Sequence, residues 1–493
     1  MIILFLIELY QELIIFQQSS YKTSKYIKTL RKYYIYSVSA YFRLLLFSLG
    51  ILCWVYNLFY IKLFTLFIIF GNLLMQERRV LKLKFTKRIF RLIFTSSILT
   101  ITSCFVKIET LIILIYLIPI IIISSSFINF PLEKMISFYY CNKAKQNIEK
   151  RKCLKIGITG SFGKTSTKFY LSQVLSEKYY VHASPKSYNT LMGISKDINQ
   201  NINEGTEIYI LEMGATKLLD IKKINNIANI NIGVITSIGT QHLESFKSIE
   251  NIIKAKLEII ESNCINTVFI NSDVQELNDY IYPQDLKVVK IGFNKNADYM
   301  ISDIEESFNN LSFKINGKVI GAKLLGKHNV LNLAFCYAIS KYLNFNEEEI
   351  IKILNDIKPM EHRLKLIKYK NHQVIDDSFN SNFIGFKNAI RSLSLSGTYN
   401  ILITPGLVEQ DAVLNEYYKE LSIMIKSAVD EVYLINNKSI KLLLKYFDDI
   451  KFKKYIVVES FKDAINLINK KNIDIFYTIL IENDLTDYYL NRG

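Results

Sequence analysis

The feature that most constrains the fold is a glycine-rich turn near the middle of the chain. It follows a short apolar run at 154–158 and has the sequence Thr159-Gly160-Ser161-Phe162-Gly163-Lys164-Thr165-Ser166. A strand, a tight glycine turn and a Lys-Thr pair opening a helix are typical of a phosphate-binding loop, because the glycines let backbone N–H groups approach phosphate oxygens. Lys164 is then expected to reach the terminal phosphates of a nucleotide, and Thr165 to contact its magnesium ion.

This turn is the shorter Gly-x-x-Gly-Lys-Thr form of the loop. The longer form has another glycine five residues before Gly163, and that position is Ile158 here. A strand-to-helix turn with a purely structural role is therefore the alternative interpretation, and the neighbouring segments have to decide between the two.

Downstream of the turn, short β-branched strands alternate with amphipathic helices, which predicts a parallel sheet with crossover helices. The strands are expected at 154–158, 207–212, 232–236 and 267–270. Ligands gather at the carboxyl ends of such strands, and Glu212 at one of these ends is a natural magnesium ligand. His242 follows the next strand, and Lys256 lies in a helix expected over 249–261. Taken alone, such a histidine is more often structural and such a lysine more often solvated.

A second α/β region begins at about residue 361. Its strands are expected at 374–377, 401–404, 431–435 and 455–458, and its longest helix at 409–428. The predicted fold class is therefore α/β, with a central P-loop parallel-sheet domain over 154–360 and a C-terminal Rossmann-like domain over 361–493.

The N-terminal region is apolar and basic. Its apolar runs are 44–75, 92–106 and 110–128, and basic clusters lie within 21–43 and 77–91. A helix needs about 20 residues to cross a bilayer, and basic loops stay on the cytoplasmic side. Residues 1–131 are thus expected to form about four transmembrane helices, with residues 1–16 as an interfacial helix or a fifth, marginal span. Core helices of a soluble domain are the alternative.

The rest of the topology follows from the same charge rule. Residues 132–153 are expected to be a basic helical linker, and the domains after it to be cytoplasmic, on a multi-pass protein of the cell membrane. The net charge of +16 comes largely from residues that flank apolar segments, and no nucleic-acid-binding motif is present, so no nucleic-acid partner is expected. The six cysteines are scattered and indicate neither a zinc site nor a disulfide framework.

Taken together, the motifs of 154–493 resemble the Mur ligase family, and within it the MurF-like members that add D-Ala-D-Ala to the peptidoglycan stem. Beyond the phosphate loop, the matching segments are Ser187-Tyr188-Asn189-Thr190, Leu211-Glu212-Met213-Gly214, Thr236-Ser237-Ile238-Gly239, His242-Leu243-Glu244, Lys254-Ala255-Lys256, Gly326-Lys327-His328-Asn329, Glu361-His362-Arg363-Leu364, Asp376-Asp377-Ser378-Phe379-Asn380-Ser381-Asn382 and Thr404-Pro405-Gly406.

The resemblance implies ATP and Mg²⁺ as cofactors and assigns roles to residues. The nucleotide-binding residues would be Gly160, Ser161, Gly163, Lys164, Thr165, Ser166, Asn329, Asn332, Arg363, Asp377 and Asn380, with Asn329 and Asn332 in the segment that contacts adenine. The magnesium ligands would be Thr165, Glu212, His242 and Lys256, the last as a carbamate. Lys164, Lys256 and His242 would be the catalytic residues.

The implied activity is ATP-driven amide-bond formation through an acyl phosphate, with a UDP- or lipid-linked peptidoglycan precursor and an amino acid or dipeptide as partners. Two departures stand out: apolar segments replace the family's soluble UDP-sugar domain, which suggests a membrane-anchored variant, and Phe379 replaces a tyrosine. Three alternatives remain, namely a lipid-linked acceptor, a poly-γ-glutamate or folate-type acceptor, and a membrane-tethered nucleotide-binding scaffold without catalysis.

Overall fold

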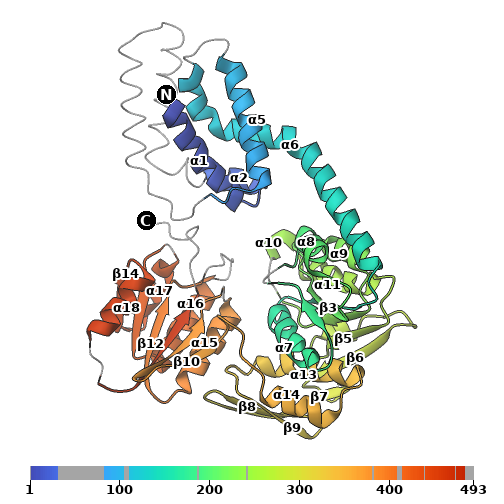
Figure 1. The fold of residues 1–493 in the computed structure, drawn as a ribbon. Helices are drawn as coiled ribbons and strands as arrows, with labels where there is room; N and C mark the ends of the chain where they lie inside the picture. Colours follow the sequence, from blue (N-terminus) through green and yellow to red (C-terminus); the bar gives the residue numbers. More distant parts are fainter. Residues whose placement is uncertain are drawn as a thin grey trace. The chain divides into compact units, whose positions relative to one another are not determined.

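A computed structural model of the chain forms two compact units, residues 1–138 and 139–493 (Figure 1). The residues described are 2–31, 83–104, 110–185, 188–239, 243–379, 382–407, 414–437, 439–471 and 474–483. The described part of the first unit is helical, and the second unit contains two β-sheets with helices on their faces.

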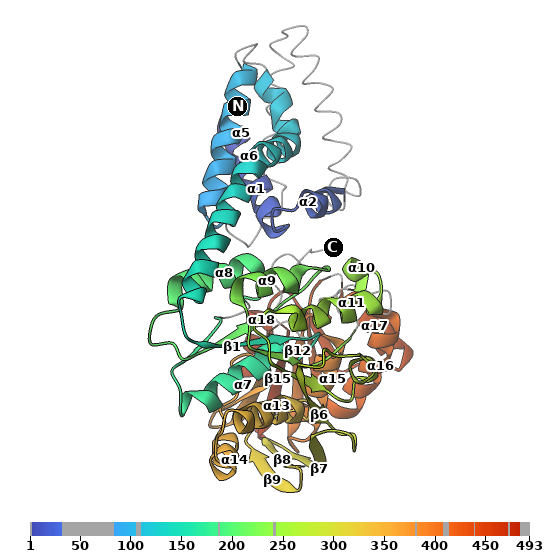
Figure 2. The ribbon, with the colours of Figure 1, turned by 90° about the vertical axis from the view of Figure 1, so that its right-hand side faces the viewer.

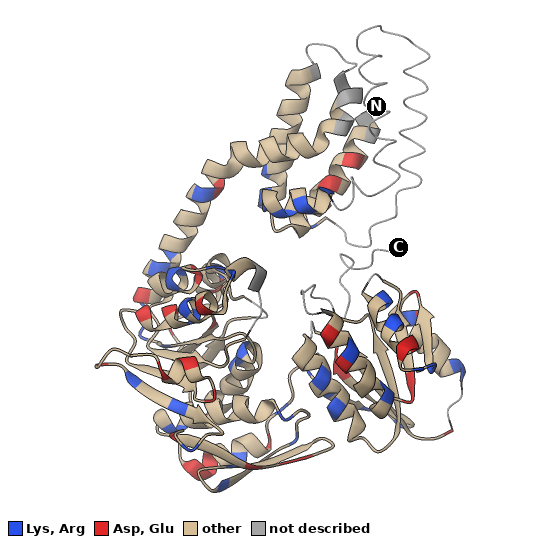
Figure 3. Cartoon of the chain, turned by 180° about the vertical axis from the view of Figure 1, so that it is seen from behind, with Lys and Arg blue, Asp and Glu red and all other residues tan. Residues whose placement is uncertain are grey.

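The described part of the first unit contains α1 (Ile2–Gln18), α2 (Thr23–Leu30), α5 (Lys87–Cys104) and the first part of α6 (Thr110–Glu149). Its apolar core includes Phe16, Ile89 and Ile122, all fully buried. The basic residues of α2 and of the start of α5 lie at one end of this unit (Figure 3). There the Arg88 guanidinium lies 4.2 Å from the centre of the Tyr21 ring.

Helix α6 differs from the sequence-based expectation. It is one helix of 40 residues that covers both the apolar run at 110–128 and most of the linker at 132–153, with Pro119 and Pro131 in its interior. A proline removes one backbone hydrogen bond, and here the turns on both sides continue the helix across it.

The prediction of about four transmembrane helices is not supported by the described residues. Among them, only the segment Leu117–Glu149 of α6 is long and apolar enough to cross a membrane, with a mean hydropathy of 1.3. Helix α5 has 18 residues, but Lys87, Arg88 and Arg91 occupy its first turns and leave too short an apolar length. The predicted hairpin at 44–75 lies outside the described residues.

The central sheet has nine strands in the order β2-β3-β1-β4-β5-β6-β7-β8-β9. It is parallel from β2 to β7 and antiparallel from there to β9. The strands are β1 (Leu154–Thr159), β2 (Val181–Ala183), β3 (Ile208–Glu212), β4 (Ile232–Ile235), β5 (Thr267–Asn271), β6 (Lys287–Gly292), β7 (Tyr299–Ser307), β8 (Asn310–Ile315) and β9 (Lys318–Ala322).

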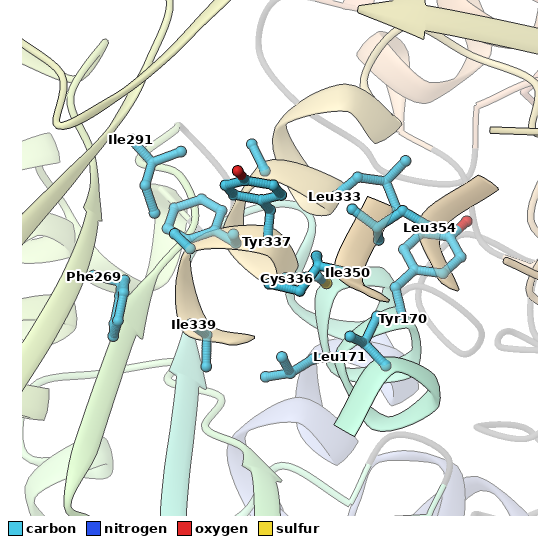
Figure 4. Packing of buried hydrophobic residues seen from close by; sticks show 14 of the residues in the cluster. Tyr170, Leu171, Phe269, Ile291, Leu333, Cys336, Tyr337, Ile339, Ile350 and Leu354 are labelled. Atoms are coloured by element: carbon cyan, nitrogen blue, oxygen red, sulfur yellow. The ribbon is translucent and has the colours of Figure 1, made fainter. Parts of the chain in front are cut away.

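Helices cover both faces of this sheet, as the near-continuous apolar strands require. One face carries α7 (Lys164–Ser176), α13 (Asn329–Tyr342) and α14 (Glu347–Asn355), and Figure 4 shows Leu171 of α7 and Ile339 of α13 in its core. The other face carries the end of α6 and the helices α8 (Leu191–Asn201), α9 (Asp220–Ala228) and α11 (Ile249–Leu257) (Figure 2). The short helices α10 (Leu243–Phe246) and α12 (Gln275–Asn278) complete this region.

The C-terminal sheet has the order β10-β11-β15-β12-β13-β14, parallel except for β10. Its strands are β10 (Lys365–Lys368), β11 (His372–Asp377), β12 (Tyr399–Thr404), β13 (Glu431–Ile435), β14 (Tyr455–Val458) and β15 (Tyr477–Glu482). Its helices are α15 (Phe383–Ser394), α16 (Leu414–Ala428), α17 (Ile440–Asp449) and α18 (Phe461–Lys470).

All eight strands expected from the sequence are confirmed, with bounds that move by a few residues at most. The helix expected over 249–261 is α11 followed by a 3₁₀ turn, Glu258–Glu261, and the long C-terminal helix is α16. Seven further strands were not expected: β2, β6 to β9, β10 and β15.

Candidate functional site

The glycine-rich turn leads from β1 into α7 in the conformation that a phosphate-binding loop needs. Gly160 and Gly163 have φ values of +147° and +80°, which side chains on L-residues rarely tolerate. A Cβ at Gly160 would lie 2.2 Å from Thr236 Oγ1. Only glycine therefore fits these two positions, and the N-terminus of α7 begins directly after them.

Strand β4 and the residues after it brace this turn. The Ser161 N–H donates to the Ser237 carbonyl at 2.9 Å, and the Phe162 N–H donates to Ser237 Oγ at 2.6 Å. Thr236 Oγ1 donates to the Phe162 carbonyl at 2.5 Å. These hydrogen bonds fix the turn against the end of β4, and in this structure they occupy the N–H groups of Ser161 and Phe162.

Lys164, the first residue of α7, folds over the turn. Its Nζ donates to the carbonyls of Gly160 and Ser161 at 2.6 and 2.9 Å. Burial lowers the pKa of Lys164, while the negative charge of Glu212 acts in the opposite direction. Thr165 and Ser166 follow in the first turn of the helix.

Glu212 ends β3 and is only 2% exposed. Thr165 Oγ1 donates to its Oε2 at 2.9 Å, and Asn189 Nδ2 donates to its Oε1 at 3.0 Å. The structure therefore brings together Thr165 and Glu212, two of the four residues predicted to hold magnesium, because β1 and β3 are parallel neighbours whose carboxyl ends coincide.

Lys256, on α11, is 4% exposed. Burial, together with the positive charge of Lys164, lowers its pKa to about 7, and Glu258, Asp220 and Glu212 partly oppose this. A neutral amine is the form of lysine that reacts with carbon dioxide, so this environment suits the predicted carbamate. Two other predicted residues, His242 and Asn380, lie outside the described part of the chain.

Asn329 and Asn332 begin α13, and both are 4% exposed. Asn332 Oδ1 accepts from Thr167 Oγ1 at 3.1 Å, and Asn332 Nδ2 donates to Asn329 Oδ1 at 3.1 Å. Asn329 Nδ2 donates to the Leu325 carbonyl at 2.8 Å. These amides tie α13 to α7, and the structure does not test their predicted contact with adenine.

Arg363 and Asp377 lie at the start of the C-terminal domain. The Arg363 guanidinium stacks 4.7 Å from the centre of the Phe379 ring, so the residue that replaces the family's tyrosine holds the arginine. Burial raises the pKa of Asp377 to about 6, although the positive charge of Arg363 and a hydrogen bond from Glu482 lower it.

Two charged residues near the predicted site residues were not anticipated from the sequence, Glu482 in the C-terminal domain and Lys168 in the central domain. Glu482 lies directly opposite Asp377 on the adjacent strand β15, and that strand was absent from the expected set. Lys168 forms a buried ion pair with Glu212, with 3.3 Å between Nζ and Oε2. Its spacing of four residues from Lys164, on the same face of α7, was the available signal.

Comparison with known proteins points to one family. Residues 158–340 match the Mur ligase middle domain. The chain is 32% identical over 284 residues to UDP-N-acetylmuramoyl-tripeptide–D-alanyl-D-alanine ligase of Bacillus subtilis, over 56% of this chain and 62% of that protein. The same-named ligase of Buchnera aphidicola subsp. Baizongia pistaciae is 30% identical over 332 residues, 65% of this chain and 71% of that protein.

Solved structures share the fold. MurF ligase from Thermotoga maritima in complex with ADP has a TM-score of 0.61 at 22% identity, over 70% of this chain and 80% of that one. A MurF structure from Acinetobacter baumannii has a TM-score of 0.62 at 20% identity, over 70% of this chain and 76% of that one. The matched part of the chain covers 62% of the length of the Bacillus relative, which is less than two thirds. Because the Buchnera relative is 30% identical with 71% of its length covered, and residues 158–340 match the middle domain, the chain belongs to the Mur ligase family.

Proposed function

We propose that this protein is an ATP-dependent ligase that forms an amide bond on a carboxylate of a peptidoglycan precursor. The observation that carries the proposal is the group around the carboxyl ends of β1 and β3. There Lys164 lies over the phosphate loop and Thr165 contacts Glu212. The charges of Lys164 and Glu212 both act on the pKa of the buried Lys256.

The proposed reaction has two steps. An oxygen of the acceptor carboxylate attacks the γ-phosphorus of ATP, and ADP leaves. The incoming amine then attacks the carbonyl carbon of the acyl phosphate, loses a proton, and displaces inorganic phosphate. Lys164 and the N–H groups at the start of α7 would stabilise the negative charge on the phosphates in the first step.

The residues present fit magnesium. Thr165 Oγ1 and Glu212 Oε2 are hard oxygen donors only 2.9 Å apart, and Mg²⁺ is typically held by one or two carboxylates together with substrate phosphates. Within the described residues, which leave out His242, no group of three or more His, Cys, Asp or Glu side chains gathers. When bound, the ion would neutralise charge on the phosphates; we include His242 and carbamylated Lys256 as further ligands.

The substrates are proposed from the relatives' names. The similar ligases join D-alanyl-D-alanine to a UDP-N-acetylmuramoyl-tripeptide. For this chain we propose a UDP- or lipid-linked precursor as acceptor, with an amino acid or a dipeptide as the amine. A poly-γ-glutamate or folate-type acceptor, and a scaffold that binds nucleotide without catalysis, would be revealed by the same assay.

We also infer that the first unit attaches the protein to the cell membrane as a multi-pass anchor, with the ligase domains in the cytoplasm. Helix α5 exposes an apolar stripe, Phe90, Phe94, Ile98 and Ile101, each 44% to 68% exposed. Polar residues lie between α5 and α6 instead: Ser96 and Ser125 are fully buried, with 2.9 Å between their hydroxyl oxygens. Apolar residues outside and hydrogen-bonded small polar residues inside are typical of helices packed in lipid.

The test is phosphate release by the purified full chain in detergent with ATP, magnesium and bicarbonate. UDP-linked and lipid-linked muramoyl peptides would be offered in turn, each with D-Ala-D-Ala and with single amino acids. We expect turnover with one such pair, and loss of it in Lys164→Ala and Lys256→Ala. ATP binding without turnover for any pair would favour the scaffold instead.

A further inference from the structure

A buried ion pair lies behind the phosphate loop. Lys168 is on α7, one helical turn after Lys164, and is 5% exposed. Its Nζ lies 3.3 Å from Glu212 Oε2 and donates to the Ser184 carbonyl at 2.8 Å. Lys168 therefore connects three segments, namely α7, the chain after β2 and the end of β3.

The same carboxylate is held from its other sides. Asn189 Nδ2 donates to Oε1 at 3.0 Å and Thr165 Oγ1 donates to Oε2 at 2.9 Å. The backbone N–H of Glu212 donates to Ser184 Oγ at 3.2 Å. Both the position and the rotation of the carboxylate are thus set by named partners, and Lys168 is the only cation within hydrogen-bonding distance of it among the described residues.

We propose that Lys168 is a positioning residue that keeps Glu212 Oε2 beside Thr165 Oγ1, so that the two oxygens are preorganised for the divalent cation that accompanies the nucleotide. This inference rests on the proposed nucleotide–magnesium site. It goes beyond that proposal because Lys168 would act through Glu212 and contact neither the nucleotide nor the metal.

The physical argument is one of cost. Burying a charged lysine and a charged glutamate carries a desolvation penalty, and well-packed apolar residues often stabilise a fold as well or better. Lys168 contacts Glu212 Oε2, the same oxygen that Thr165 contacts. An ion pair at this oxygen can orient the carboxylate for a metal ion, whereas an ion pair elsewhere in the fold could not. Partners that orient a metal ligand typically change metal affinity 10- to 100-fold when they are removed.

The experiment measures metal and nucleotide binding separately on the purified full chain. Mn²⁺ replaces Mg²⁺ as the probe, and its binding in the presence of ADP is followed by electron paramagnetic resonance. ADP binding in EDTA is followed by calorimetry. In Lys168→Met we expect Mn²⁺ affinity to fall about tenfold or more, while ADP affinity in EDTA stays unchanged. Lys168→Arg, which keeps the charge, should recover most of the Mn²⁺ affinity.

The controls separate the outcomes. Lys178→Met, just after the end of α7, removes a lysine that contacts the Asn344 carbonyl and should change neither measurement. Equal losses of Mn²⁺ and metal-free ADP binding in Lys168→Met, or no loss at all, would overturn the positioning role. Should Lys168→Met fail to fold, Lys168→Gln takes its place, since it also removes the positive charge. A selective loss of Mn²⁺ affinity in Lys168→Gln supports the role, and Lys168→Gln that is indistinguishable from wild type overturns it. A wild-type protein that binds no Mn²⁺ with ADP would remove the proposed function and this inference together.

Discussion

At the scale of single residues, Lys256 gives the clearest pH-dependent behaviour. Its pKa is lowered from 10.5 to about 7 in the folded protein. Between pH 7 and pH 10.5, the Lys256 amine carries a proton in the unfolded chain but not in the folded one, so the free energy of unfolding rises with pH. Below pH 7 the amine is charged in both states, and the folded protein bears the whole cost of burying that charge. The slope is about 1.4 kcal/mol per pH unit for one proton.

The corresponding prediction compares wild type with Lys256→Met in buffer free of carbon dioxide. From pH 7 toward pH 10, the free energy of unfolding of wild type should rise relative to that of the variant, by at most about 1.4 kcal/mol for each pH unit. Chemical denaturation at several pH values measures it. Lys254→Met, on the exposed side of the same helix, is the matched control and should leave the slope intact. A pH-independent difference between wild type and Lys256→Met would contradict the prediction.

A second prediction for a single residue concerns the contribution of Glu212 to the free energy of unfolding. Glu212→Gln leaves Lys168 buried without its anion, and breaking one side of a buried ion pair costs about 3–5 kcal/mol of stability. Urea denaturation of the two proteins measures the loss. Glu276→Gln, at an exposed position, should stay within about 0.5 kcal/mol of wild type. A similarly small effect of Glu212→Gln would mean that the pair is not buried in solution.

At the scale of elements, the phosphate loop depends on glycine for two separate reasons, backbone conformation and space. Gly163 and Gly317 have nearly the same φ, +80° and +82°, but a Cβ at Gly163 would lie 2.7 Å from Asn332 Oδ1, whereas nothing lies within 4 Å at Gly317. The two positions therefore separate the conformational cost from the steric one.

We expect Gly317→Ala to lower the free energy of unfolding by about 1–2 kcal/mol, the cost of the left-handed conformation. Gly163→Ala should lose about 1–3 kcal/mol more through overpacking, and nucleotide binding should be lost with it. Thermal unfolding and ADP titration of both variants provide the measurement. Equal destabilisation of the two, with binding retained, would show that the loop tolerates a side chain.

Element boundaries show where local patterns were sufficient. The alternation of apolar strands and amphipathic helices predicted β1, β3, β4 and β5 because these strands are short, buried and flanked by turn residues. The strands from β7 to β9 alternate exposed and buried residues with polar side chains outside, a weaker signal that the sequence did not separate from loop. The boundary expected between the apolar region at 1–131 and the linker at 132–153 falls inside one helix, α6, which continues to Glu149.

At the scale of the whole molecule, the membrane proposal yields a direct test. Membranes from cells expressing the full chain would be washed with alkaline carbonate, and we expect the protein to stay in the pellet. Phe94→Lys places a charge in the exposed apolar stripe of α5, where contact with lipid would carry a desolvation penalty, and should lower the retained fraction.

The control lies in the second unit. Ile281 is 91% exposed there, and Ile281→Lys should leave the retained fraction unchanged. Complete release of the wild-type protein by carbonate would show that the first unit does not span the bilayer. In that case the apolar stripe of α5 would have to be covered by protein.

The sequence by itself determined the features that depend on neighbouring residues: the glycine turn, the parallel strands around it, and the order of motifs typical of the family. Tertiary structure alone decided which distant side chains meet. The pairing of Glu212 with Lys168, the burial of Lys256 near Lys164 and the alignment of Glu482 with Asp377 all follow from the order of strands in the sheets. Periodicity records which face of an element is buried, whereas strand order, set by packing of the whole sheet, determines which ends lie together.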